Sequence, residues 1–160
     1  MPANKSLRLP ALDPADIEPR LTTIYPAQFA DITKGREKKV LGNPLGLTQF
    51  GVNLTVLNPG AASALRHYHR TEDEFVFVME GEATLVTDDG EQILGPGMAA
   101  GFPAGKPDGH HLVNRSNAPV LYLEVGTRAR EDDCVYPDVD MIAKKRDGEF
   151  RLFAKDGTPY

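Results

Sequence analysis

Apolar side chains recur at every second position between residues 50 and 56, and the positions between them are polar or glycine. This alternation predicts a strand with one buried face. Further short apolar runs follow, separated by turn sequences rich in Gly, Pro, Asn and Asp. They predict strands at residues 63–69, 74–80, 82–87, 91–94, 98–102, 110–114 and 120–125. About eight short strands at this spacing are typical of an all-β sandwich or small barrel.

The run from Phe75 to Met79 is apolar on both faces of its predicted strand. Side chains alternate between the two faces of a strand, so neither face of this one should see much water. We therefore expect one face to pack in the core and the other in a subunit interface. Together with a long N-terminal arm, this pattern favours a homodimer.

Two less regular segments flank the predicted barrel at residues 47–128. Residues 1–46 are punctuated by proline and predict an arm, with a short strand at 20–25 and at most a helical turn within 28–39. We expect this arm to lie across its own barrel or a partner subunit. Residues 129–160 are polar and predict a tail packed on the barrel, with one short hairpin or strand near 149–153. The chain is thus expected to form one domain.

Composition excludes several classes of protein. The 160 residues carry a net charge of -5 and no long basic run, which argues against binding to nucleic acid. No apolar run approaches the roughly 20 residues of a membrane span, and the first residues lack the apolar core of a signal peptide. The single cysteine cannot form an internal disulfide, which is consistent with a reducing cytoplasm.

The four histidines fall in two patches, His67 and His69, then His110 and His111. On a strand, His67 and His69 point to the same face, and Glu74 can return to that point from the next strand. His110 and His111 must point to opposite faces, so only one can join them. Imidazoles with a carboxylate form a donor set for one divalent transition metal. We expect Zn first, with Mn, Fe, Ni, Co or Cu as alternatives.

Two motifs resemble those of the cupin superfamily: Gly60-x6-His67-x-His69-x4-Glu74-x6-Gly81 and Gly97-x5-Pro103-x-Gly105-x4-His110-x3-Asn114. The resemblance implies a jelly-roll barrel whose metal ligands are His67, His69, Glu74 and His110. It also implies that the structural positions are Gly60, Gly81, Gly97, Pro103, Gly105 and Asn114. The Gly60–His67 and Gly105–His110 spacings are longer than the family's usual ones, by one and two residues. More loosely, the chain is similar to single-domain bacterial cupins of the cupin 2 conserved-barrel type, which share its Tyr-Pro-Asp-x-Asp element and Asp-Gly-Thr-Pro-Tyr tail.

Several neighbouring residues are weaker candidates for the site. Candidates for lining a pocket are Gln49, Asn53, Lys106 and Asp108. Residues expected to lie outside the ligand set are His111, Glu72, Asp73, Arg66 and Tyr68. The two acids are expected to be solvated, although Asp73 is an alternative to Glu74, and Arg66 and Tyr68 should face out of the barrel. Cys134 lies in an acidic segment and is expected to be exposed and inert.

The resemblance implies a metal-dependent enzyme acting on a small polar molecule. The metal would serve as a Lewis acid in an isomerase or lyase, or bind oxygen in an oxygenase. No further acid pair or histidine is expected inside the barrel as a dedicated base, so the catalytic residues stay unassigned. The alternative is a non-catalytic module that binds or senses a small molecule or metal, since one fold serves many functions.

Overall fold

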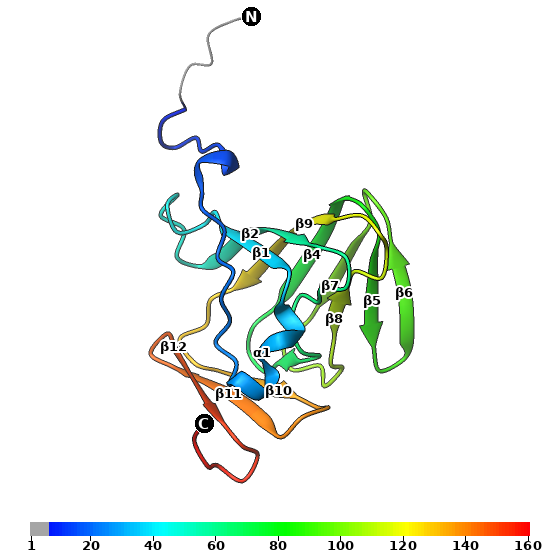
Figure 1. The fold of residues 1–160 in the computed structure, drawn as a ribbon. Coiled ribbons are helices and arrows are strands. Elements are labelled where there is room, and N and C mark those ends of the chain that lie inside the picture. Colours follow the sequence, from blue (N-terminus) through cyan, green and yellow to red (C-terminus); the bar gives the residue numbers. More distant parts are fainter. Residues whose placement is uncertain (1–6) are drawn as a thin grey trace, which may run out of the picture.

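The computed structural model describes residues 7–160, which form a jelly-roll barrel with an additional C-terminal sheet (Figure 1). The first six residues of the predicted arm lie outside this range. Short helical turns occupy Pro14–Asp16 (η1), Ala27–Ala30 (α1) and Asp31–Thr33 (η2). The strands are β1 (Arg36–Val40), β2 (Phe50–Leu57), β3 (Tyr68–His69), β4 (Glu74–Glu80), β5 (Ala83–Thr87), β6 (Gly90–Leu94), β7 (Ala99–Phe102), β8 (His111–Val113), β9 (Val120–Thr127), β10 (Asp132–Tyr136), β11 (Met141–Arg146) and β12 (Glu149–Phe153).

Two antiparallel sheets face each other across the barrel core. One has the order β1-β2-β9-β4-β7 and the other the order β6-β5-β8. Their inward side chains form one buried cluster that includes Leu57, Val78, Leu85, Val120 and Tyr122. The predicted all-β fold is therefore confirmed. On β2, however, the buried residues are Thr55 and Leu57, and the alternating apolar residues Phe50, Val52, Leu54 and Val56 lie on the other, partly exposed face.

The outer face of the larger sheet is also apolar. Val76 and Val78 of β4 are buried, whereas Phe75, Phe77 and Met79 are 42%, 38% and 46% exposed in the single chain. The alternation thus places one half of this two-sided apolar strand in the core. The other half stays exposed in the described chain.

The C-terminal segment forms more than the single hairpin expected from the sequence. Strands β10, β11 and β12 make a sheet with β3 in the order β12-β11-β10-β3, below the barrel in Figure 1. Alternate residues of β10 are buried, and Cys134 and Tyr136 pack with Met141 and Ala143 in a second apolar cluster. Because β3 belongs to the barrel segment, this sheet brings residues 132–136 beside the histidines.

The N-terminal arm lies against its own barrel. Arg20 makes one bridge to Lys38 in place of the predicted strand, and Tyr25 and Phe29 pack on the second apolar cluster. Residues 28–39 contain α1, η2 and then β1, which pairs along its length with β2. The barrel sheet therefore begins before Leu47. Strand β1 was not predicted, because its sequence Arg-Glu-Lys-Lys-Val is mostly charged.

The motif positions implied by the resemblance shape the turns. Gly81 has φ +78°, and a Cβ there would lie 2.5 Å from the carbonyl oxygen of Pro119, so only glycine fits. Asn114 is fully buried, and its Nδ2 donates hydrogen bonds to the carbonyl oxygens of Leu57 and Ala118, each at 2.8 Å. These contacts close the barrel end behind β8. Within residues 7–160, no helix is long and apolar enough to cross a membrane.

Candidate metal centre

Three histidines and one glutamate meet inside the barrel from three segments of chain. His67 pairs with His110 in an isolated antiparallel bridge, and His69 lies on β3. Of the strand predicted at 63–69, only β3 forms. Residues 63–66 lie outside any strand, between the isolated bridge of Ala62 with Val113 and that of His67 with His110. Glu74 opens β4. The topology therefore brings together the four residues that the resemblance implied as ligands.

The Nε2 atoms of the three histidines converge on the Glu74 carboxylate. Nε2 of His110 lies 2.8 Å from Oε2, and Nε2 of His67 lies 3.4 Å from the same oxygen. Nε2 of His69 lies 3.6 Å from Oε1. Four donor groups thus surround one point.

The opposite nitrogen of each ring is held by the protein. Nδ1 of His67 donates to the carbonyl oxygen of Leu65 at 2.8 Å, and Nδ1 of His110 lies 3.4 Å from that of Asp108. Phe102 also stacks flat on His110, with ring centroids 3.5 Å apart. A carbonyl oxygen can only accept, so the Leu65 contact places a proton on Nδ1 of His67 and directs its Nε2 at Glu74. In His110 the shorter contact is that of Nε2 with the Glu74 carboxylate, so without a metal this nitrogen donates to the carboxylate, and a metal would take the place of that proton.

This arrangement fits a divalent transition metal. Metal–nitrogen and metal–oxygen bonds of about 2.0–2.2 Å place neighbouring ligand atoms roughly 3.0–3.6 Å apart. The separations between the Nε2 atoms and the Glu74 oxygens fall close to this range. His67, Glu74 and His110 form one cluster of mutually close donor atoms. The nitrogen and oxygen donors also suit a borderline ion.

The charges of the cluster stabilise one another in the absence of an ion. Burial alone would raise the pKa of Glu74, but His67 and His110 hold it well below its usual value. Burial would lower the pKa of His67, but its neighbours Cys134 and Glu74 raise it to about 9. Burial lowers the pKa of His110. The metal-free site is therefore a network in which protonated imidazole takes the place of a cation.

Asp132 anchors His69 and was not singled out in the sequence. Its Oδ2 lies 2.5 Å from Nδ1 of His69, and its Oδ1 accepts hydrogen bonds from N and Oγ1 of Thr71, each at 2.8 Å. The residue is 2% exposed. Burial would raise the pKa of Asp132, but the bonds from His69 and Thr71 lower it to about 2. The alternation of residues 132–136 is the only sign of Asp132 in the sequence, and the sequence predicts these residues as part of a polar tail.

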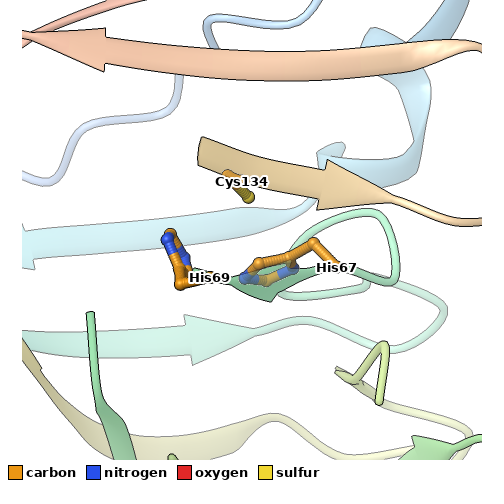
Figure 2. Close-up of side chains that lie close together, drawn as sticks. All are labelled: His67, His69 and Cys134. Atoms are coloured by element: carbon orange, nitrogen blue, oxygen red, sulfur yellow. The ribbon is translucent and has the colours of Figure 1, made fainter. Parts of the chain in front are cut away.

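Cys134 is also buried, contrary to expectation. It is 3% exposed and lies opposite His69 in the β10–β3 pairing. Figure 2 shows its side chain directed toward the rings of His67 and His69. The acidic sequence around it concealed a strand whose alternate residues face inward.

Two cavities reach the converging residues: the larger includes all four in its wall, and the smaller includes all but His67. The larger, of about 530 Å³, is lined by Asn53, and the smaller, of about 280 Å³, is lined by Lys106 and Asp108. Gln49 is exposed and lines neither cavity. Both cavities include His69, Glu74 and His110 in their walls. The site is therefore open to a small molecule from more than one side.

A further carboxylate lies in the larger cavity. Glu124 of β9 forms an ion pair with Lys38 and accepts a hydrogen bond from Nδ2 of Asn53 at 2.9 Å. In the pairing of β4 with β9, Val76 faces Glu124 and Glu74 faces Gly126. Glu74 and Glu124 are therefore diagonal neighbours on the inner face of the sheet. No further acid pair was expected inside the barrel, and Glu124 adds one acid beside Glu74.

Some of the remaining residues near the site lie where the sequence predicts, and others do not. Glu72 is 8% exposed, not solvated, because the C-terminal sheet covers it and its Oε1 accepts a 2.6 Å hydrogen bond from Lys145. Asp73 is exposed as expected. Tyr68 lines the smaller cavity. Arg66 and His111 lie apart from the converging Nε2 atoms. Arg66 pairs with Asp88 and Asp138, and Nδ1 of His111 donates to the Ala64 carbonyl oxygen at 2.8 Å.

A jelly-roll barrel with histidines and a carboxylate converging inside it is the architecture of a cupin. The chain belongs to the cupin superfamily. Residues 53–126 match the cupin domain family. The fold and the two sequence motifs thus agree with an independent comparison.

The chain is similar along most of its length to a sugar phosphate isomerase of the cupin superfamily from Silicibacter pomeroyi. The two are 48% identical with a TM-score of 0.91, over 94% of this chain and 96% of that one. A protein from Acidithiobacillus ferrooxidans is 29% identical with a TM-score of 0.71, over 78% and 80%. A cupin 2 conserved barrel domain protein from Salinispora arenicola, 22% identical over 78% and 91% with a TM-score of 0.55, shares the fold. No curated protein matches the sequence.

Proposed function

We propose that the protein is a metal-dependent isomerase that acts on a small phosphorylated sugar. The observation that carries this proposal is the convergence of three Nε2 atoms on Glu74 beside a cavity of about 530 Å³. The sugar phosphate isomerase from Silicibacter pomeroyi supports the choice of substrate and reaction, because the similarity extends over 94% of this chain.

The ligands proposed for the metal are His67, His69, Glu74 and His110. An ion bound there would polarise a carbonyl or hydroxyl group of the substrate as a Lewis acid. Zn²⁺ is our first choice for the ion, and Mn²⁺, Fe²⁺ and Ni²⁺ suit the same donors. The histidines reach this point already oriented, because their Nδ1 atoms are held by Leu65, Asp132 and Asp108.

Glu124 is the residue that we assign to proton transfer. Isomerisation of a sugar moves a proton between neighbouring carbons, so a carboxylate beside the substrate is needed. Glu124 lines the cavity next to Glu74 and is not engaged with the histidines. Lys38 and Asn53 hold its Oε1 atom and so orient the carboxylate.

Cationic side chains on the cavity wall support an anionic substrate. Basic residues that line the cavity are Arg20, Arg36, Lys38, Arg128 and Lys145. Lys38 and Lys145 are paired with glutamates, but Arg36 is 8% exposed and its buried Nε has no hydrogen-bond partner among the described residues. Guanidinium groups are well suited to phosphate.

The test is turnover of aldose and ketose phosphates by metal-loaded protein. We expect interconversion that is lost in His67→Ala and reduced in Glu124→Gln, with the metal retained in the second variant. Gln49→Ala is the control, because Gln49 lines neither cavity. Tight binding of sugar phosphates without turnover would assign the chain to the alternative class, a non-catalytic binding or sensor module.

We also propose that the protein functions as a homodimer. The exposed row Phe75, Phe77 and Met79 lies on the outer face of the five-stranded sheet. A second copy of the same face would remove these side chains from water. Size-exclusion chromatography with light scattering tests this, and a uniform species of 17.5 kDa would refute it.

A further inference from the structure

Cys134 occupies a position that packing alone does not account for. It is the only cysteine of the chain, so no disulfide within the chain can explain its place. Its side chain is 3% exposed and contributes to the second apolar cluster, yet it also forms part of the wall of the larger cavity. The thiol is therefore shielded from bulk water and open to the interior of the site.

The strand pairing directs the thiol at the histidines. Cys134 and His69 are direct partners in the antiparallel pairing of β10 with β3, so their side chains project on the same face. His67 lies two residues before His69 and shares that face. Figure 2 shows the sulfur projecting toward both rings.

The three donor atoms are close enough to share one ion. One donor atom each of His67, His69 and Cys134 lies within 4.8 Å of the others. His67 belongs to this cluster and to the cluster with Glu74 and His110. Cys134 is not grouped with Glu74 and His110, so thiolate ligation requires the ion, with His67 and His69, to lie toward β10.

We propose that Cys134 supplies a thiolate ligand to the metal bound by His67 and His69, which makes the centre selective for thiophilic divalent ions. This inference rests on the metal centre of the proposed function. When the metal–sulfur bond forms, the thiol releases its proton to solvent. The charge of the ion compensates for burial of the thiolate. Thiolate favours Zn²⁺ and Co²⁺ over Mn²⁺, which prefers oxygen donors.

The direct test uses Co²⁺ added to metal-free protein. A cobalt–thiolate bond produces an intense charge-transfer band in the near ultraviolet, whereas cobalt bound to nitrogen and oxygen alone shows only weak visible bands. We expect both sets of bands in the wild type. Cys134→Ser should keep the visible bands and lose the charge-transfer band. Val135→Ala is the matched control, because Val135 is next in sequence, lies on the opposite face of β10 and leaves the sulfur in place.

The outcomes separate this inference from the proposed function. Visible bands without a charge-transfer band in the wild type would overturn thiolate ligation and leave the metal centre intact. A charge-transfer band that persists in Cys134→Ser would also overturn it. Failure of the wild type to bind Co²⁺ at all would refute the metal centre, and thiolate ligation with it.

Metal selectivity gives a second measurement. In competition with a chelator, Cys134→Ser should bind Zn²⁺ about tenfold or more weakly than the wild type. Its affinity for Mn²⁺ should change by less than about twofold, since Mn²⁺ gains little from sulfur. An equal loss for both ions would indicate a disturbed site without thiolate ligation and would overturn the proposed selectivity.

Discussion

Nδ1 of His69 lies 2.5 Å from Oδ2 of Asp132, and the two residues come from strands 63 positions apart in the chain. The carboxylate is almost completely buried and is itself fixed by two hydrogen bonds from Thr71. Such a carboxylate orients the imidazole and increases its basicity toward a metal. The C-terminal sheet therefore takes part in building the site within the barrel.

Asp132→Asn should weaken binding of Zn²⁺ by about 10–100-fold, because the amide keeps the shape of the carboxylate and loses its charge. Affinity is measured by competition with a chromogenic chelator. Asp133→Asn is the control, since Asp133 is next in sequence and pairs with Arg70 and Arg146 on the opposite face of β10. Equal affinity of Asp132→Asn and wild type would show that Asp132 only supports the fold.

Removal of a ligand should remove the metal. Protein purified without chelator should contain nearly one ion per chain, and His67→Ala or His110→Ala should contain almost none, as measured by elemental analysis. His111→Ala should keep its ion, because the imidazole of His111 is bonded to the Ala64 carbonyl oxygen, apart from the converging Nε2 atoms. Loss of metal from His111→Ala alone would show that the ligand assignment in the second motif is wrong.

The barrel could be predicted from the sequence because its signals are local. Alternating apolar residues mark β2, and turn residues separate the later strands, so their positions agree with the structure to within two residues, except that the strand expected at 63–69 contracts to β3. His67, His69 and Glu74 could be grouped by strand parity alone. His110 required the resemblance to the cupin motif, because spacing did not choose between it and His111.

The remainder depended on pairing between distant segments. Cys134 and Asp132 reach the histidines only because β10 pairs with β3, and no local sequence pattern predicts that pairing. The sequence predicts Glu72 as a solvated turn residue, and its hydrogen bond with Lys145 of β11 becomes visible only in the structure. Charged residues at 36–39 likewise concealed β1, because their inward members form ion pairs and hydrogen bonds inside the barrel.

Metal binding should release protons at neutral pH. In the metal-free protein, burial would lower the pKa of both His67 and His69, but their neighbours raise the values to about 9 and about 11. Both rings therefore carry an extra proton at pH 7, and the metal must displace it from each. The apparent affinity should rise with pH between 6 and 8.

Proton release is measured by titration calorimetry in buffers of different ionisation enthalpy. The wild type is the protein of choice, because Cys134 contributes to the raised pKa of both rings. We expect about two protons per ion from the rings at pH 7, and about one more if the thiol also binds the metal. An affinity that is independent of pH in this range would show that both imidazoles are already neutral in the empty site.

The buried pair of Glu72 and Lys145 should contribute strongly to stability. Their side chains are each 10% exposed, and Nζ of Lys145 lies 2.6 Å from Oε1 of Glu72. Lys145→Met would leave the carboxylate buried with the Ala129 amide as its hydrogen-bond partner and Nδ1 of His69 3.8 Å from its Oε2, and should lower the free energy of unfolding by about 3 kcal/mol. Urea denaturation of the metal-free protein measures the change.

Two further variants separate the charge from the packing. Glu72→Gln combined with Lys145→Met should recover most of the lost stability, because no uncompensated charge remains buried. Arg130→Met removes the pair with Asp147, whose two side chains are 87% and 83% exposed, and should cost less than about 1 kcal/mol. If the double variant is no more stable than Lys145→Met, the loss comes from packing of the lysine stem against Phe150, over whose ring Nζ lies at 5.2 Å.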